Sequence, residues 1–420
     1  MTPMLKNYNA TRIACYIGYI TQAITINLAP LFFIIFQDRY EVSFSRIGQL
    51  VLITFIIQLL VDLVCIGIVE KIGYRALSVA AHVFAAFGLI LLGVLPPLFD
   101  NAYTGILIAV FFYSIGGGLT EVVISPLVDA LPSDAKASSM SLLHSFYSWG
   151  QCLVVLVTTL VLFVIGQERW MILPVFWALI PAADAVLFCL VPIPEAEEGG
   201  KERHGIRDLL GSGMFYVCIV LMICGGASEQ TMSQWASLFA EKAIGVSKVV
   251  GDLLGPCLFA ILMGIGRTAH GVLGQRLKMA PALFGCAALS VLCYVLTVFS
   301  ASPVLALIGC AVCGFGVSLM WPGVLSLSAA RFPRAGGPMF AMLALAGDMG
   351  CSLGPWISGI VSDATEAGVW PVFAGIAGEA EQLAMKNGML VATVFPLVMF
   401  ALLAIFLIKK KGSDDGSAAE

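Results

Sequence analysis

The sequence predicts an all-α membrane protein, with twelve transmembrane helices in two six-helix bundles. Two features of its composition support this fold class: 60% of the residues are hydrophobic and only 11% are charged, with a mean hydropathy of +0.97. Soluble domains contain about 25% charged residues. The third observation is that the apolar residues gather into long runs separated by short polar segments. The small net charge of -4 and the lack of a basic stripe argue against nucleic-acid binding.

Apolar runs long enough to cross a bilayer occur twelve times, since a spanning helix needs about 20 mostly apolar residues. The runs are residues 11–36, 43–69, 76–98, 103–129, 141–165, 170–191, 214–239, 253–273, 279–299, 303–329, 338–361 and 388–408. The strongly charged stretch at 192–213 separates six runs from six, and the mixed segment 363–387 predicts a longer loop before the last helix.

These boundaries divide the chain into four parts. We expect an N-terminal six-helix bundle at residues 1–194 and a cytoplasmic central loop at 195–213. A C-terminal six-helix bundle then follows at 214–411, and a disordered cytoplasmic tail at 412–420.

The distribution of basic residues predicts the orientation. With the N-terminus inside, 15 Lys and Arg residues lie on the cytoplasmic side and 6 lie outside. We therefore expect a multi-pass protein of the plasma (inner) membrane, with both termini in the cytoplasm.

Weak internal repetition supports two parallel halves. The segment Asn27-Leu-Ala-Pro-Leu-Phe32 resembles Gln234-Trp-Ala-Ser-Leu-Phe239, and at the same offset Gln22 corresponds to Glu229. Both come from the first helix of their half.

Glu121 places a carboxylate near the middle of the run 103–129. A charge at the centre of a bilayer costs about 2.5–3.5 kcal/mol on insertion scales, so such a residue usually faces a protein interior and has a function there. It belongs to a stripe at helical spacing: Ser114, Gly118, Glu121, Ser125 and Asp129. We therefore predict that Glu121 belongs to a proton or substrate site.

Other runs carry polar residues at helical spacing or beside glycines, as a cavity lining requires. The predicted substrate- or proton-binding set is Gln22, Asn27, Glu121, Ser125, His144, Ser148, Trp149, Gln151, Glu229, Ser233, Trp321 and Asp348. The alternative is that these residues make interhelical contacts worth about 0.6–2 kcal/mol each. Trp149, Trp235 and Trp321 either stack on a sugar ring of the substrate or serve as packing or interfacial residues of the membrane helices.

Four acids have open assignments. Asp62, in the row Thr54, Gln58 and Asp62, is either functional or part of a structural lock with Arg267 or with the loop charges. The same alternatives hold for Asp348. Asp129 and Asp184 are expected near helix ends, where a charge reaches water.

The loop after the second run carries the most specific local motif. Glu70-Lys71-Ile72-Gly73-Tyr74-Arg75 resembles the Asp-Arg/Lys-x-Gly-x-Arg/Lys pattern of the major facilitator superfamily. The match is partial, because Ile66 occupies the position of the leading glycine and the second-half copy around Arg276 lacks the acid. The resemblance implies the major facilitator fold. It also implies gating by Glu70, Lys71, Gly73, Arg75 and Arg276; positive-inside topology alone is the other explanation for the loop charges. Asp62 and Arg267, from the intramembrane polar residues, complete the predicted gating set.

Within that superfamily, Gly118-Leu-Thr-Glu121-Val-Val-Ile-Ser125-Pro126 resembles the fourth helix of the fucose–galactose–glucose:proton symporter group, with Ser125 in place of an Asn. The acid that this group has shortly before the proline of the first helix is absent here before Pro30. The resemblance implies a secondary active transporter that imports a small polar solute, preferably a monosaccharide, by alternating access coupled to protons. A proton-antiport exporter of amphiphilic compounds and a non-transporting receptor or scaffold stay open as alternatives.

The sequence indicates no enzyme and no cofactor, since no motif places a nucleotide loop, a metal-ligand cluster or a nucleophile–base pair. The 12 cysteines lie mostly in apolar runs, and Cys310-Ala-Val-Cys313 has no second pair near it. The expected partners are a small-molecule substrate, protons and the lipid bilayer, and the expected state is a monomer.

Overall fold

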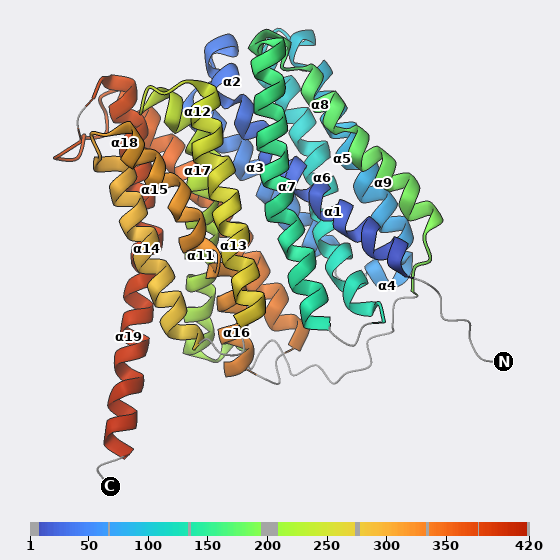
Figure 1. The fold of residues 1–420 in the computed structure, drawn as a ribbon, viewed down its shortest axis with the longest axis vertical. Helices are drawn as coiled ribbons and strands as arrows, with labels where there is room; N and C mark the ends of the chain where they lie inside the picture. The colour runs from blue at the N-terminus through green and yellow to red at the C-terminus, as the bar shows by residue number, and fades with distance from the viewer. Residues whose placement is uncertain are drawn as a thin grey trace. The chain divides into compact units, whose positions relative to one another are not determined.

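The computed structural model describes residues 8–65, 68–132, 136–194, 209–273, 278–332, 336–376 and 378–417. Every regular element in these ranges is helical (Figure 1). Twelve helical spans are long and apolar enough to cross a membrane, which confirms the predicted fold class. The chain forms two compact units, residues 1–43 with 53–200 and residues 44–52 with 201–420.

The first unit contains the first six spans. Its helices are α1 (Asn9–Asn27), η1 (Ala29–Phe32), α2 (Phe33–Tyr40), α3 (Phe44–Cys65), α4 (Ile68–Ile72), α5 (Tyr74–Val94), η2 (Pro96–Leu98), α6 (Ala102–Ala130), α7 (Lys136–Ile165), η3 (Gln167–Arg169), α8 (Ile172–Trp177) and α9 (Leu179–Leu190). The opening residues of α3, Phe44–Leu52, cluster with the second unit.

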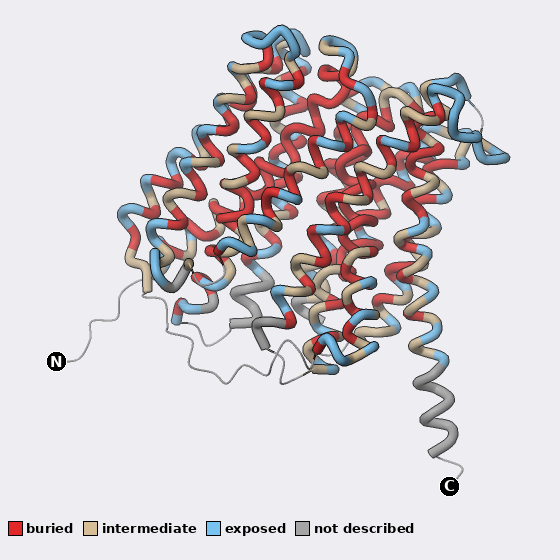
Figure 2. The backbone as a smooth tube through the Cα atoms, turned by 180° about the vertical axis from the view of Figure 1, so that it is seen from behind, coloured by how far each residue is buried: buried red, intermediate tan, exposed pale blue. Residues whose placement is uncertain are grey.

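The second unit contains the other six spans. Its helices are α11 (Gly213–Lys242), α12 (Lys248–Asp252), the π-helical turn η4 (Leu253–Cys257), α13 (Leu258–Leu273), α14 (Met279–Phe299), α15 (Pro303–Val317), α16 (Met320–Arg331), α17 (Gly336–Glu366), α18 (Ala380–Ala392) and α19 (Val394–Ser417). Within each unit, buried backbone lies where helices pack against one another (Figure 2).

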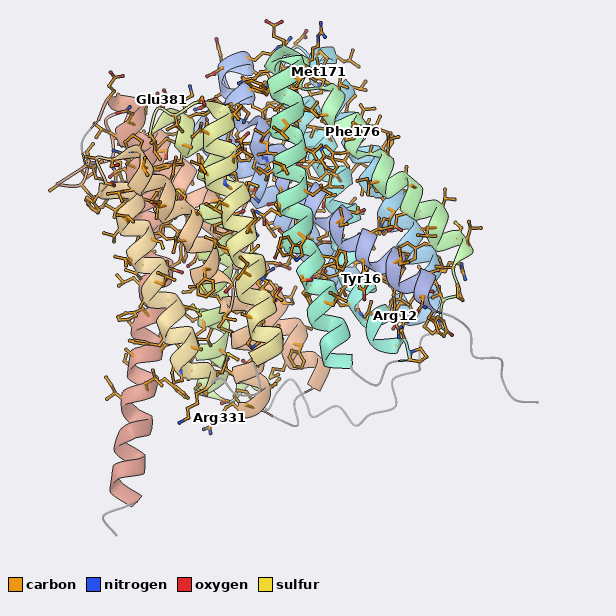
Figure 3. The ribbon with its side chains drawn as sticks, viewed as in Figure 1. Arg12, Tyr16, Met171, Phe176, Arg331 and Glu381 are labelled. Carbon is orange, nitrogen blue, oxygen red and sulfur yellow. The ribbon has the colours of Figure 1, made fainter. Side chains whose placement is uncertain are left out.

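The segment before the last span differs from the sequence prediction. The loop expected at 363–387 is shorter, because α17 continues to Glu366 and α18 begins at Ala380. A capping box explains the early start: Glu379 accepts from the backbone of the first turn, and Gln382 accepts from the Glu379 amide at 3.2 Å. Hydropathy alone missed this polar first turn, which contains Glu381, labelled in Figure 3. The Glu381 carboxylate lies 3.1 Å from Lys242 Nζ.

The last helix is also longer than expected, since α19 continues to Ser417, past residue 411. Most of the predicted central loop, residues 195–208, lies outside the described residues, as do residues 418–420.

Pro30 interrupts the first span. Proline has no backbone N–H and cannot continue an α-helix without a break, and the chain passes through the short η1 helix, where the Leu31 amide donates to the Leu28 carbonyl at 3.2 Å. The break ends α1 at Asn27, and the buried polar residues Gln22, Thr25 and Asn27 lie in the last turns of this helix.

Glycines allow α5 and α6 to approach closely. A Cβ atom placed on Gly116 would lie 2.4 Å from the backbone nitrogen of Ala85. Small residues permit such backbone contact between membrane helices. This packing fixes the register of α6 and therefore the position of Glu121.

Candidate functional site

Glu121 of α6 is held by a side chain from α1. Gln22 Nε2 donates to Glu121 Oε2 at 3.0 Å. One turn away, the Tyr19 hydroxyl and Ser125 Oγ share a hydrogen bond of 2.5 Å. Gln22 is buried and Glu121 is half-buried. The late turns of α1 therefore present two polar side chains to the predicted stripe of α6.

A third helix, α7, extends this polar group. The ring of His144 lies edge-on to Tyr19, with 5.2 Å between the ring centroids. Asn27 Nδ2 donates to the Tyr147 hydroxyl at 3.3 Å. An apolar stack lies beside it, because the rings of Tyr16 and Phe146 are parallel at 4.4 Å; Figure 3 labels Tyr16 on α1. We call Tyr19, Gln22, Asn27, Glu121, Ser125, His144 and Tyr147 the first-half polar cluster.

Other predicted residues of α7 separate into two faces. Ser148 and Gln151 are buried, at 0% and 1% exposure, whereas Trp149 is 46% exposed. Residues 148 and 149 are successive in a helix and point about 100° apart. Trp149 therefore lies on a different face from the row of His144, Ser148 and Gln151.

Gln58 of α3 is a polar residue of this region that the predicted binding set omits. It is 1% exposed, and among the described residues neither its Nε2 nor its Oε1 has a hydrogen-bond partner. Its Nε2 would lie 2.7 Å from a Cβ atom on Gly117, and Thr25 Oγ1 would lie 3.1 Å from the same point. The sequence contained a signal, since Thr54, Gln58 and Asp62 recur at four-residue spacing.

The second unit carries an ion pair among its membrane helices. Arg267 Nη2 of α13 donates to both carboxylate oxygens of Glu229 on α11, at 3.1 and 3.0 Å. Their side chains are 15% and 8% exposed. The structure thus joins one predicted binding residue to one predicted gating residue.

Further predicted residues lie on α11, α16 and α17. Ser233 and Asp348 are buried. The Trp321 ring lies so close to Gly347 that a Cβ atom there would be 2.4 Å from it. Trp235 is different, because it is buried at 1% exposure and its Nε1 donates to the Pro355 carbonyl at 3.2 Å. Trp235 therefore packs inside the second unit, and its buried ring is not accessible for stacking on a sugar.

The loop motif after α3 shows one defined set of contacts. Gly73 has a φ of +84°, which favours glycine. Arg75 donates to the carbonyls of Phe188 and Cys189 at 2.8 Å and of Val191 at 2.9 Å. Arg75 therefore binds the carbonyl end of α9 in its own unit. Lys71 is exposed and Asp62 is half-buried, while Arg276 and the side chains of Glu70 and Asp129 lie outside what the structure describes.

A buried His–Asp pair was missed by the sequence analysis. His82 Nε2 of α5 lies 2.9 Å from Asp184 Oδ2 of α9, and both side chains are 0% exposed. The prediction that Asp184 lies near a helix end, in reach of water, is wrong. It occupies the middle of α9, and hydropathy could not show this because a single acid leaves the run apolar.

Comparison with known proteins identifies the family. The family model described as Major Facilitator Superfamily matches residues 15–355. The chain belongs to the major facilitator superfamily. This confirms the resemblance inferred from the loop motif and the 6+6 pattern, and it makes the protein a transporter by family and fold.

Solved structures show the same fold at low identity. A mutant of the nucleoside transporter NupG matches with a TM-score of 0.74 and 13% identity over 94% of this chain and 99% of that one. A bacterial homologue of the human lysosomal transporter Spinster matches at 0.73 and 14%, over 95% and 97%. A mutant of the E. coli fucose:proton symporter FucP matches at 0.63 and 16%, over 95% and 99%. No curated protein sequence matches.

Proposed function

We propose that this superfamily member is a secondary active transporter that imports a small polar organic solute, a monosaccharide by preference, together with protons. It works by alternating access, as a monomer in the plasma (inner) membrane, with both termini in the cytoplasm. The observation that carries the proposal is the half-buried Glu121 carboxylate, bound by Gln22 among hydroxyl and amide groups from three helices.

The neutral polar groups around Glu121 support a hydroxylated cargo. Tyr19, Ser125 and Tyr147 offer hydroxyl groups that both donate and accept, and Asn27 adds an amide. Aromatic rings from Tyr16 and Phe146 lie beside them and suit the CH face of a sugar. FucP is named as a fucose:proton symporter and NupG as a nucleoside transporter, and this supports a cargo that contains a sugar ring.

Glu121 is the proposed site of proton coupling. As a carboxylate it accepts from Gln22 Nε2. Once protonated it carries no charge and gains an O–H donor for a solute hydroxyl. Removing one charge from the interior of a membrane protein changes the stability of each conformation differently, and this difference lets a proton gradient bias the transport cycle.

The test is uptake into proteoliposomes with an imposed proton gradient. The panel contains radiolabelled L-fucose, D-galactose, D-glucose and uridine, and an acidic exterior is expected to stimulate uptake of at least one. Glu121→Gln should abolish gradient-driven accumulation while solute exchange without a gradient persists. Glu168→Gln, at an exposed position in η3, is the matched control and should behave as wild type.

The outcome that contradicts the proton site is unchanged accumulation by the Glu121→Gln protein. If no solute accumulates but an amphiphilic dye is expelled in exchange for protons, the exporter alternative replaces the proposal. If no flux occurs in either direction, the receptor alternative replaces it.

A further inference from the structure

We infer that the buried pair His82–Asp184 is a second proton-binding site of the first unit. Its ligand is a single proton, held between His82 Nε2 and Asp184 Oδ2 at 2.9 Å. This inference rests on the proposed function only for its use in proton coupling. The site itself is argued from the geometry of α5 and α9.

The contacts of the imidazole define where the protons lie. His82 Nδ1 is 2.7 Å from the Ser78 carbonyl, which can only accept, so Nδ1 carries a proton. The contact of Nε2 with Asp184 Oδ2 at 2.9 Å is favourable only when the pair carries one further proton, since two unprotonated acceptors would repel each other. Either the imidazole is positive and the carboxylate negative, or both groups are neutral. In both forms the pair is neutral overall, and loss of the proton leaves one negative charge.

The pair has little other polar support. Among the described residues, Asp184 Oδ1, Asp184 Oδ2 and His82 Nε2 make no hydrogen bond of normal geometry, and the pair is joined by the close contact of 2.9 Å. A buried carboxylate oxygen without a donor is costly while it is charged. Packing of α5 on α9 does not require a titratable pair, because apolar residues of similar volume often serve as well in place of a buried ion pair. Arg75 already binds α5 to the end of α9 by three hydrogen bonds.

The position of the pair connects it to Glu121 through α1. A Cβ atom on Gly18 would lie 3.4 Å from His82 Nε2 and 3.2 Å from Ile124 on α6. Gln22, which donates to Glu121, comes four residues after Gly18 and lies about 6 Å further along nearly the same face of the helix. The helix α1 has no carboxylate of its own. A change of charge at the pair therefore changes the electrostatic potential at the face of α1 that carries Gln22.

Few other charges act on the pair. The Cys15 thiol of α1 interacts electrostatically with Asp184, and the Phe188 ring covers His82 at 5.1 Å. The helix α8 contains no titratable residue. The remaining titratable or charged residues on α5, α9 and the elements packed against them are Tyr74 and Arg75 on α5, Arg12, Tyr16 and Tyr19 on α1, Glu70 and Lys71 on α4, Tyr103, Tyr113, Glu121 and Asp129 on α6, and Cys189 on α9.

The test observes the proton directly and needs no transported solute. The full chain has four histidines, so replacing His144, His204 and His270 by Asn leaves His82 as the one source of imidazole signals. Nitrogen NMR of the ¹⁵N-histidine-labelled protein in lipid nanodiscs then reports the protonation of each ring nitrogen. Between about pH 5 and pH 8, we expect Nδ1 to stay protonated while the Nε2 signal titrates.

Asp184→Asn in the same background tests whether the two residues act as one site. Because strongly interacting groups share their titration steps, its midpoint should move by more than about one pH unit. A purely structural pair would show the same Nε2 signal at every pH in this range, and that result overturns the inference. An unchanged midpoint in Asp184→Asn also overturns it.

The two proposals fail in different measurements. If His82 does not titrate while Glu121→Gln abolishes gradient-driven uptake, the second proton site is wrong and the proposed function stands. If His82 titrates but no solute is transported, the proton site stands and the proposed function is wrong.

Discussion

Arg267 on α13 donates from one guanidinium nitrogen to both carboxylate oxygens of Glu229 on α11, at 3.1 and 3.0 Å. Each residue alone would place an isolated charge among membrane helices, and together they form a neutral pair. The pairing gives the second unit a charged contact between two helices, whereas in the first unit the carboxylate of Glu121 is met by a neutral amide.

The first prediction concerns this pair. Arg267→Met should destabilise the protein by about 3 kcal/mol, because removing one partner of a buried pair leaves the other charge uncompensated. Adding Glu229→Gln to that variant should restore part of the loss. Thermal unfolding in detergent, followed by tryptophan fluorescence, measures both effects. A double variant no more stable than Arg267→Met would show that the pairing contributes little.

The second prediction concerns Gln58, whose buried amide has no hydrogen-bond partner in the described part of the chain. Gln58→Leu should raise stability by about 1 kcal/mol, since an unsatisfied buried polar group is costly. It should also reduce solute uptake at least tenfold if the amide binds solute. Gln49→Leu, at an exposed position of the same helix, is the control for both measurements. Wild-type uptake by the Gln58→Leu protein would remove Gln58 from the site.

The third prediction concerns the close contact of α5 and α6. Gly116→Ala should destabilise the protein by about 1–3 kcal/mol, because its new methyl group would meet the Ala85 backbone nitrogen at 2.4 Å. Gly285→Ala is the matched control, since within the described residues no atom outside the local helix backbone lies within 4 Å of a Cβ atom there. The control should be neutral or slightly stabilising, as alanine favours a helix over glycine. Equal unfolding temperatures for the two variants would contradict this account of the packing.

The fourth prediction separates structure from gating at Arg75. Its three hydrogen bonds to the carbonyls at the end of α9 predict that Arg75→Ala lowers stability by about 1.5–3 kcal/mol. Lys71→Ala, in the same loop motif but exposed, should unfold like the wild type. Unfolding midpoints and solute exchange rates are measured together. If Arg75→Ala leaves stability unchanged but alters exchange, gating is the main role of Arg75.

Much of the architecture was predictable because it follows from local properties. Runs such as 279–299 and 103–129 are apolar enough to identify membrane spans without any partner, and the first coincides with α14. Helix ends with polar first turns were less predictable. The start of α18 at Ala380 depends on the capping box of Glu379, which a hydropathy criterion does not detect.

The site was predictable only in part. Spacing identified Glu121 and its stripe, because one helix determines which residues share a face. The partners of Glu121 come from other helices, and Gln22 is 99 residues away in the chain. His82 and Asp184 escaped notice for the same reason, since each is a lone polar residue in its own run.

The sequence by itself determined the number of spans, the family and the presence of a costly carboxylate in the fourth span. Each of these depends on how residues of one segment interact with a bilayer or repeat along one helix. Only the tertiary structure decided that Gln22 binds Glu121, that Arg267 binds Glu229 and that His82 contacts Asp184. The physical reason is that helix packing chooses these partners, through close glycine contacts such as those of Gly18 and Gly116, and packing is a property of several helices at once.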